Sequence, residues 1–214
     1  MKKKLVLVGG GGHAKSVIDT IKSGEEYDII GIVDMPENIG KTIEGIKIIG
    51  TDENLSTYYK EETRYAFISL GSIGNPQSRI RIYNFIKNMG FEIPNIIDRT
   101  AILGENIIMG EGCFVGKGAI INTSVKIGNN VIVNTGVVVE HDCSINNFVH
   151  IAPSTTLCGG VKIGENSHIG AGTTIIQNIS VGKNCIIGAG SVVLSDVEKN
   201  YLAYGVPAMR KTKL

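Results

Sequence analysis

The protein has 214 residues, a length that allows one large domain or two small ones. Hydrophobic residues make up 43% and charged residues 19%, so the chain can bury a sizeable core and is not disordered. Lys and Arg total 21 against 20 Asp and Glu, and the formal net charge of +1 supplies no general field for nucleic acid or an acidic membrane. The 28 glycines, the absence of tryptophan and the 6% aromatic content favour a core of Val and Ile in a repeated geometry.

Residues 1–95 are predicted to form a small Rossmann-like α/β domain. Strands are expected at 5–8, 29–33 and 65–69, and a helix is expected at 14–21. A second helix should start at Asn75 and Pro76, with Asn as the cap and Pro at the first helical position, and should end at Gly90. The alternation of strand and helix predicts a truncated parallel sheet.

The turn after the first strand carries a weak dinucleotide-binding pattern. Gly9, Gly11 and Ala14 fit the G-x-G-x-x-G/A spacing, and Asp34 follows 20 residues after Ala14. Such glycines let backbone N–H groups approach a phosphate, while the acid accepts hydrogen bonds from a ribose or base. The alternative is a tight turn without a ligand. The short domain and the histidine after the glycines favour a nucleotide-sugar over NAD, with candidate binding residues Gly10, Gly11, Gly12, His13 and Asp34.

A six-residue repeat occupies the second half of the chain. From Ile97 to Val193 every sixth residue is aliphatic or Met, over 17 positions, and the next residue is Gly in eight of these hexads. Asparagine takes the same position at 122, 134 and 146. We expect these glycines and asparagines to mark corners because both residue types tolerate left-handed backbone angles. The pattern predicts a parallel β-helix at 96–198, in which three hexads make a coil, residues 18 apart stack, and about 5.7 coils rise roughly 27 Å.

The cysteines fit the repeat better than they fit a catalytic or redox role. Cys113, Cys143 and Cys185 fall in its small interior position and Cys158 falls at a corner, and none forms a CxxC pair. A covalent acyl-cysteine mechanism is therefore not expected. The first apolar run, 5–8, is too short for a signal peptide or a membrane span. We expect a cytoplasmic protein with reduced thiols, no metal, and no binding to nucleic acid or insertion into membranes.

Three of the four histidines lie in the repeat. His141 should occupy a corner or the outer surface between Glu140 and Asp142, and an imidazole beside a carboxylate is typical of a general base, although a surface histidine without a role is the alternative. His150 and His168, 18 residues apart, should stack on adjacent coils, and we interpret His168 as a packing residue. His141 and His150 are half a coil apart, so they would share a site only across a subunit boundary.

The motifs LVGGGGHAK, EHDCSINNFVHIAP, CGGV and GVPA together resemble the sialic-acid O-acetyltransferase and UDP-4-amino-sugar N-acetyltransferase (NeuD/PglD-like) family of hexapeptide-repeat proteins. The resemblance covers nearly the whole chain and implies a left-handed β-helix, a handedness that periodicity alone does not give. It also implies a homotrimer with active sites between subunits. The segment IIDRTA at 96–101 departs from the family, which usually has His-Pro before the first coil.

The resemblance implies an acetyl-CoA-dependent N-acetyltransferase that acts on a UDP-4-amino-4,6-dideoxy sugar in bacterial glycan biosynthesis, by direct transfer. His141 would be the base, Asp142 would orient it, and His150 would contact the thioester carbonyl. Residues 199–214 would form a C-terminal tail near acetyl-CoA. The expected acetyl-CoA-binding residues are His150, Gly159, Gly170, Ala189 and Pro207.

Three other functions are compatible with parts of the sequence. O-acetylation of sialic acid or another sugar hydroxyl would use the same residues. A zinc hydratase of the γ-carbonic-anhydrase kind would need three converging histidines, and spacings of 9 and 18 residues do not favour it. A non-catalytic nucleotide-sugar-binding protein would leave the histidines without a chemical role.

Overall fold

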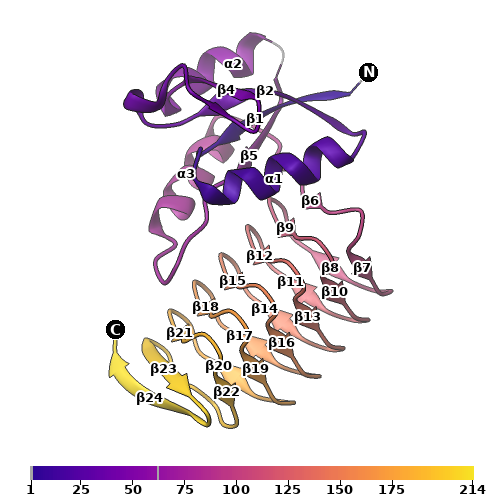
Figure 1. Ribbon diagram of the computed structural model, residues 1–214, viewed down its shortest axis with the longest axis vertical. Coiled ribbons are helices and arrows are strands. Elements are labelled where there is room, and N and C mark those ends of the chain that lie inside the picture. The colour runs from indigo at the N-terminus through magenta and orange to yellow at the C-terminus, as the bar shows by residue number, and fades with distance from the viewer. Residues whose placement is uncertain (1, 62) are drawn as a thin grey trace. The chain divides into compact units, whose positions relative to one another are not determined.

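The computed structural model describes residues 2–61 and 63–214, which form two compact units (Figure 1). The N-terminal unit contains the residues up to Ser72 together with Gln77–Arg99. The repeat unit contains Ile73–Pro76 and Thr100–Leu214. The short segment Ile73–Pro76 therefore belongs to the repeat unit, although the residues on both sides of it belong to the N-terminal unit.

The N-terminal unit is built on a five-stranded sheet of order β3-β4-β2-β1-β5. Strands β1, β2, β4 and β5 are parallel, and β3 pairs antiparallel with β4. This confirms the predicted Rossmann-like sheet. The elements are β1 (Lys3–Val8), α1 (Gly12–Ser23), β2 (Tyr27–Val33), η1 (Pro36–Asn38), β3 (Thr42–Ile43), β4 (Ile46–Gly50), η2 (Asp52–Asn54), α2 (Leu55–Glu61), β5 (Tyr65–Ile68), α3 (Gln77–Asn88) and β6 (Ile96–Ile97).

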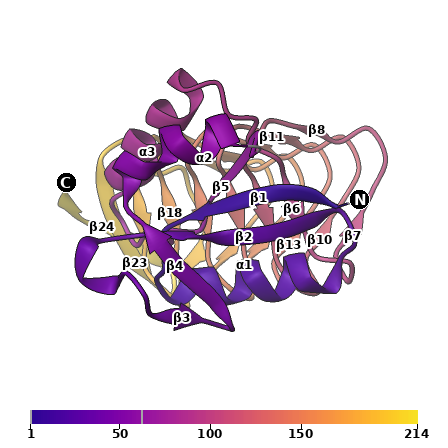
Figure 2. The ribbon, with the colours of Figure 1, turned by 90° about the horizontal axis from the view of Figure 1, so that it is seen from above.

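Helices cover both faces of this sheet. Val6 and Val8 of β1 share a buried core with Leu55 of α2 and with Ile82 and Ile86 of α3. Figure 2 shows α1 on the other side of the strands. Because both faces are covered, β1 reads as a continuous apolar run rather than as an alternating one. The carboxyl ends of β1 and β2 lie at the same edge, which is where open parallel sheets bind ligands.

Several N-terminal elements differ from the sequence-based expectation. Helix α3 begins at Gln77, one residue after Pro76, so the prediction of Pro at the first helical position was wrong. The β3–β4 hairpin was not predicted, because its turn is Glu44-Gly45 and a glutamate with φ of 46° is an unusual turn residue. Helix α2 was also missed.

The repeat unit is a left-handed parallel β-helix with three flat faces. Face 1 contains β7, β10, β13, β16, β19 and β22; face 2 contains β8, β11, β14, β17 and β20; face 3 contains β9, β12, β15, β18 and β21. The pairing of Ile120 with Val138 and of Val138 with Thr156 shows the predicted 18-residue coil. The strands are β7 (Ile102–Leu103), β8 (Ile108–Met109), β9 (Phe114–Val115), β10 (Ile120–Ile121), β11 (Lys126–Ile127), β12 (Ile132–Val133), β13 (Val138–Val139), β14 (Ser144–Ile145), β15 (His150–Ile151), β16 (Thr156–Leu157), β17 (Lys162–Ile163), β18 (His168–Ile169), β19 (Thr174–Ile175), β20 (Ser180–Val181), β21 (Ile186–Ile187) and β22 (Val192–Val193).

The interior of the coils is filled by the predicted aliphatic positions. From Val115 to Val193 every one of them is buried, and Cys113, Cys143 and Cys185 are buried beside them. The first repeats are the exception, since Ile97 and Leu103 are 40% and 39% exposed. For Leu103 the reason is that β7 lies at the edge of face 1 and pairs only with β10 there.

The corner glycines are required for a different physical reason from the one predicted. Glycines directly after the aliphatic residue are not in the left-handed region; a Cβ at Gly164 or Gly170 would instead lie 2.4 or 2.5 Å from a backbone nitrogen of the next coil. The left-handed residue comes two positions later, as at Asp142 and Asn184. Asn184 also accepts a hydrogen bond from Asn166 at 3.0 Å and donates one to Asn200 at 2.9 Å, which links three successive coils.

A hairpin follows the last coil and was not predicted as such. Strand β23 (Tyr201–Gly205) pairs parallel with β21, and β24 (Ala208–Lys213) pairs antiparallel with β23. The connection contains a cis bond between Val206 and Pro207. Strand β24 is therefore the outer strand of the sheet on face 3.

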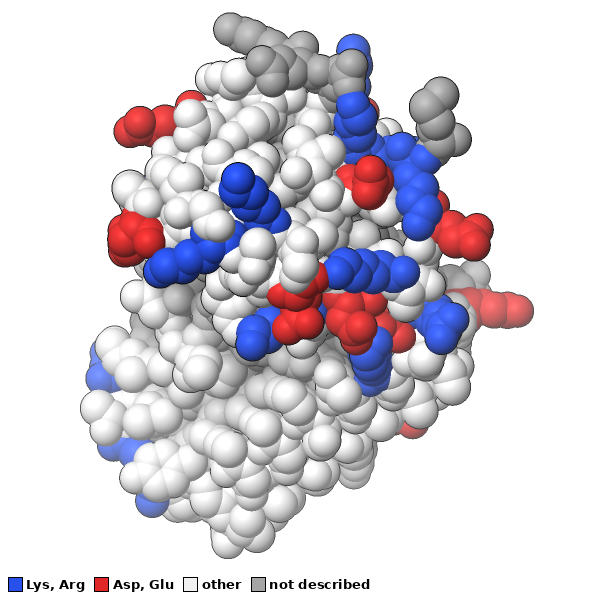
Figure 3. Space-filling model, turned by 45° about the horizontal axis from the view of Figure 1, so that its top comes forward, with Lys and Arg blue, Asp and Glu red and all other residues white. Residues whose placement is uncertain are grey.

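Charged side chains are unevenly distributed on the visible surface. In Figure 3 they gather over the N-terminal unit, where positive and negative groups are interspersed, and the repeats are mostly uncharged. This view contains no broad basic surface. In the described chain, no helix is long and apolar enough to cross a membrane.

Candidate active site

His141 lies at the corner between β13 and β14, on the outside of the β-helix. Its Nδ1 is 2.8 Å from Oδ2 of Asp142, and both side chains are more than half exposed. Asp142 is the left-handed residue of this corner, with φ of 61°. A carboxylate accepts a hydrogen bond from Nδ1–H, so it fixes the tautomer in which Nε2 is unprotonated. The pair can therefore accept a proton at Nε2 of His141.

Gly159, one coil further on, lies directly against the His141 ring. A Cβ at this glycine would be 2.7 Å from both Cε1 and Nε2 of His141. The neighbouring Gly160 N–H donates to the His141 carbonyl at 2.9 Å, which fixes the spacing between the two corners. Gly159 was predicted to line acetyl-CoA, and the structure shows that its missing side chain makes room for the imidazole.

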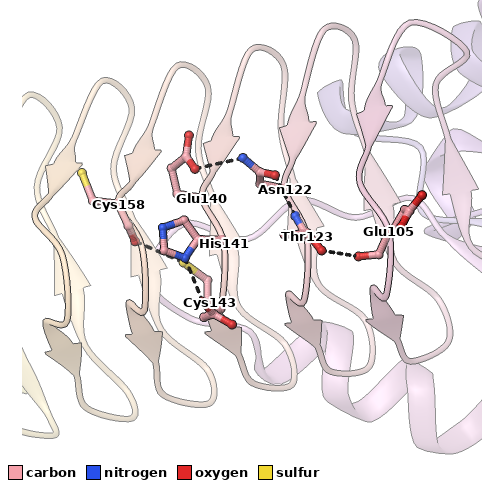
Figure 4. Close-up of polar contacts among 8 residues, drawn as sticks. Glu105, Asn122, Thr123, Glu140, His141, Cys143 and Cys158 are labelled. Atoms are coloured by element: carbon pink, nitrogen blue, oxygen red, sulfur yellow. Dashed lines mark hydrogen bonds and ion pairs between the residues drawn. The ribbon is translucent and has the colours of Figure 1, made fainter.

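A set of polar contacts supports the coil that carries His141 (Figure 4). The Asn122 amide donates to Oε2 of Glu140 at 3.0 Å, and the Oδ1 of Asn122 accepts from the Thr123 N–H at 2.8 Å. Thr123 Oγ1 in turn donates to the Glu105 carbonyl at 3.0 Å. Asn122 and Glu140 were not among the predicted site residues. Each directly follows the aliphatic residue of its hexad, and their separation of 18 residues, one coil, is the signal that could have found them.

The cysteine nearest His141 in the chain is buried and serves the core. The Cys143 thiol donates to the Cys158 carbonyl at 3.2 Å, and burial raises the pKa of Cys143 to about 11. Burial also raises the pKa of Cys185. Thiols that remain protonated at physiological pH are poor nucleophiles, so neither residue can carry an acyl group readily.

His150 and His168 stack on β15 and β18 of face 3, as predicted. They are partners in the strand register, and their ring centroids are 4.9 Å apart. Nε2 of His150 is 3.4 Å from the amide nitrogen of Asn134. The corner that carries His141 joins faces 1 and 2 and is therefore opposite face 3. One chain does not bring His141 and His150 together.

The other predicted acetyl-CoA residues lie near the C-terminal coils. Gly170 follows β18 at the corner between faces 3 and 1, and a Cβ there would be 2.5 Å from the Ala189 nitrogen, so these two positions are neighbours. Pro207 is exposed in the turn between β23 and β24. Gly159 lies at the His141 corner instead and His150 lies on face 3, so the structure does not bring the predicted set together in one chain.

The N-terminal unit contains a cavity of about 530 Å³ at the carboxyl ends of β1 and β2. Asp34 lies in its wall, where Oδ2 accepts from the Gly10 N–H at 2.9 Å and Oδ1 accepts from the Met35 N–H at 2.7 Å. The structure therefore brings Asp34 to the glycine-rich turn, as expected, and directs the Gly10 N–H toward Asp34. The lining residues are Val8, Gly9, Val33, Asp34, Met35, Pro36, Thr51, Asp52, Glu53, Leu70, Ser78, Arg81, Ile82 and Phe85.

The start of α1 provides backbone donors for an anion. The N-cap is Gly11, which has no side chain to accept from the first N–H groups, and the first turn contains no acidic residue. Gly11 and Gly12 are exposed, and nothing lies within 4 Å of where their Cβ atoms would be. The first N–H groups of a helix lack intrahelical acceptors and bind phosphate well. His13 lies in the same turn and packs against Gly71.

An ion pair in the wall of this cavity was not predicted from the sequence. The Arg81 guanidinium on α3 is 3.2 Å from Oδ2 of Asp52, and both residues line the cavity. No sequence motif identifies Arg81, because its position in the cavity depends on how α3 packs on the sheet. Within residues 2–61 and 63–214 no group of three His, Cys, Asp or Glu side chains is arranged to hold a metal ion.

Comparisons with known proteins agree with this two-part architecture. Residues 4–86 match the PglD N-terminal domain, 106–141 match the hexapeptide repeat of succinyl-transferase, and 142–177 and 160–195 match the bacterial transferase hexapeptide. A perosamine N-acetyltransferase from Caulobacter crescentus, solved as a histidine mutant in complex with CoA and GDP-perosamine, is 33% identical, with a TM-score of 0.92 over 98% of this chain and 97% of that one.

Two further relatives extend the comparison. The acetyltransferase domain of PglB from Neisseria gonorrhoeae, solved with acetyl coenzyme A, is 31% identical, with a TM-score of 0.91 over 99% of this chain and 100% of that one. The GDP-perosamine N-acetyltransferase of Escherichia coli O157:H7 is 26% identical over 167 residues, which are 75% of this chain and 72% of that protein.

Proposed function

Because this chain belongs to the PglD-like family of sugar acetyltransferases, we propose that it transfers the acetyl group of acetyl-CoA to an amino group of a nucleotide-linked sugar. The chain is an acyltransferase, and acetyl-CoA is its co-substrate. The observation that carries the proposal is the exposed His141–Asp142 pair, 2.8 Å apart, with Gly159 leaving room for the ring. The relatives from C. crescentus and E. coli are N-acetyltransferases, which favours an amine over a sugar hydroxyl as the acceptor.

In the proposed reaction the sugar amine attacks the thioester carbonyl directly. A bond forms between the amine nitrogen and the carbonyl carbon, and the carbon–sulfur bond then breaks. Nε2 of His141 takes one proton from the nitrogen and returns it to the departing thiolate of CoA, so that free CoA and the amide are the products. Asp142 stabilises the imidazolium that forms between these two steps.

His150 is proposed to donate a hydrogen bond to the thioester oxygen as negative charge develops there. Since His141 and His150 lie on opposite sides of one coil, the site needs His150 of a second copy, and we propose a homotrimer. Face 1, which borders the His141 corner, suits one side of such an interface because its outward residues carry no charge, and face 3 of the second copy would bring His150. The outward residues of face 1 are Ile102, Ile120, Val138, Thr156, Thr174 and Val192.

The cavity beside Asp34 is proposed to hold the nucleotide. The base and ribose would occupy the space between Val33 and Phe85, and the diphosphate would meet the backbone N–H groups at the start of α1 together with Arg81. The expected nucleotide from the family resemblance is UDP, on a 4-amino-4,6-dideoxy sugar. A GDP-linked amino sugar is the second candidate, favoured by the relatives from C. crescentus and E. coli.

A mass-spectrometric screen tests the proposal. The protein and acetyl-CoA are incubated with UDP-linked and GDP-linked 4-amino sugars and with free sialic acids, and we expect an amino sugar nucleotide to gain one acetyl group. The His141→Ala variant is the control for uncatalysed transfer. Acetylation of sialic acid alone would establish the hydroxyl acceptor instead, and failure to acetylate every nucleotide sugar would contradict the proposed substrate class.

A further inference from the structure

A second buried imidazole, without a role in the proposed reaction, lies one coil beyond His150. His168 is 8% exposed, as is His150, and the two are register partners on β18 and β15. Their ring planes are 76° apart at a centroid distance of 4.9 Å. This is the edge-to-face geometry in which aromatic rings attract each other.

His168 lies between one polar and one apolar neighbour in the outward column of face 3. His150 precedes it and Ile186 follows it. Burial lowers the pKa of His168, so its ring is neutral at physiological pH. Its Nδ1 is buried and has no hydrogen-bond partner in the described structure. His168 therefore contributes through the ring contact, because an unsatisfied nitrogen is a cost rather than a gain.

His150 is held from a second side by Asn134. The amide nitrogen of Asn134 is 3.4 Å from Nε2 of His150, and an amide nitrogen only donates, so Nε2 accepts and the neutral ring carries its proton on Nδ1. Asn134 thus fixes the tautomer and His168 packs against the ring. We propose that His168 is a positioning residue whose ring holds the His150 imidazole in the orientation that acetyl transfer requires. This inference rests on the proposed function, which assigns His150 to the thioester carbonyl.

Two substitutions at one position separate the ring contact from other roles. His168→Phe keeps an aromatic edge and removes the unsatisfied nitrogen, so we expect kcat within about twofold of wild type and an equal or higher Tm. His168→Leu fills similar space without a ring, and we expect kcat to fall by about two- to tenfold, the worth of one edge-to-face contact, while the KM for the nucleotide sugar is unchanged.

A double substitution tests whether His168 acts through His150. His150→Ala should lower kcat by about 10²- to 10³-fold, as the loss of an oxyanion donor does, and adding His168→Leu to it should cost nothing further. The imidazole ¹⁵N signals of His150, assigned by their loss in His150→Ala, should report the Nδ1–H tautomer in the wild type and in both His168 variants, because Asn134 fixes the tautomer. They should broaden only in His168→Leu, because the ring there loses the contact that fixes its orientation.

Four outcomes would overturn the inference. Equal loss in His168→Phe and His168→Leu would mean that the His168 nitrogen contacts a ligand. If His168→Leu lowered kcat by the same factor in the wild type and in His150→Ala, the two residues would act independently. Wild-type turnover in His168→Leu, together with the expected loss in His150→Ala, would remove the role of His168 and leave the proposed function intact. Wild-type turnover in His150→Ala would instead show that His150 does not stabilise the thioester carbonyl, on which the inference rests.

Discussion

The substitution Gly159→Ala adds one methyl group beneath the proposed catalytic base. The new Cβ would lie 2.7 Å from Cε1 and Nε2 of His141, whereas ordinary contacts are 3.4–4 Å. The imidazole must therefore move by about 1 Å, and it can do so without unfolding the corner because its side chain is 58% exposed. A displacement of this size at a reacting group costs about 10²-fold in rate.

Steady-state kinetics and thermal unfolding together measure this effect. We expect kcat to fall by about 10²-fold, within the range of about 10²- to 10⁴-fold expected for His141→Ala. The Tm and the KM for the nucleotide sugar should stay near their wild-type values. Combining Gly159→Ala with His141→Ala should give no further loss, because the methyl group acts only by displacing the ring.

Gly164→Ala is the matched control. Its Cβ would lie 2.4 Å from the backbone nitrogen of Lys183, which cannot rotate away, so this variant should lose stability while its folded fraction turns over normally. A Gly159→Ala enzyme with wild-type kcat and Tm would refute the assignment of His141 as a precisely placed base. A rise confined to the KM for acetyl-CoA would support the predicted lining role of Gly159 instead.

Three further predictions concern the nucleotide, the subunit boundary and the cysteines. Arg81→Ala should raise the KM for the nucleotide sugar about tenfold, the worth of one charge-assisted hydrogen bond, with Lys87→Ala on the same helix as the unaffected control; an unchanged KM would place the diphosphate elsewhere. Inactive His141→Ala and His150→Ala chains, unfolded and refolded together, should recover up to about a quarter of wild-type activity by random assortment into trimers, and no recovery would contradict a site shared between subunits. The free energy of unfolding should fall as pH rises from about 9 to 11, because the unfolded Cys143 thiol ionises near pH 9 while its folded pKa is about 11. Thermal melts of Cys143→Ala should show a shallower fall of Tm over this range, and an identical fall would mean that another group is responsible.

The repeat could be predicted from sequence because its physics is local and periodic. An aliphatic residue every sixth position can be buried only if successive coils stack, and the pairing of His150 with His168 follows from that spacing alone. The reason for the corner glycines could not be read in the same way. Steric exclusion by the next coil at Gly170 is a contact between residues far apart in sequence, whereas backbone angles are a property of one residue.

The candidate site was predictable where its members are neighbours in the chain. His141 and Asp142 are adjacent, and the glycine-rich turn is continuous from Gly9 to Gly12. The contact of Gly159 with the His141 ring depends on the coil length, and the position of Arg81 depends on the packing of α3. Neither contact leaves a local signature. The assignment of His141 as base and of His150 as oxyanion donor remains a prediction.

The hairpin after the last coil bears on how the protein behaves in concentrated solution. A stack of parallel strands ends in a row of backbone groups that can pair with any passing chain, and such edges seed aggregation. On face 3 the outermost strand is β24, which carries Arg210, Lys211 and Lys213 in an exposed segment. A second copy that paired its own β24 with this one would bring like charges together, so the hairpin opposes edge-to-edge pairing of two copies through this strand.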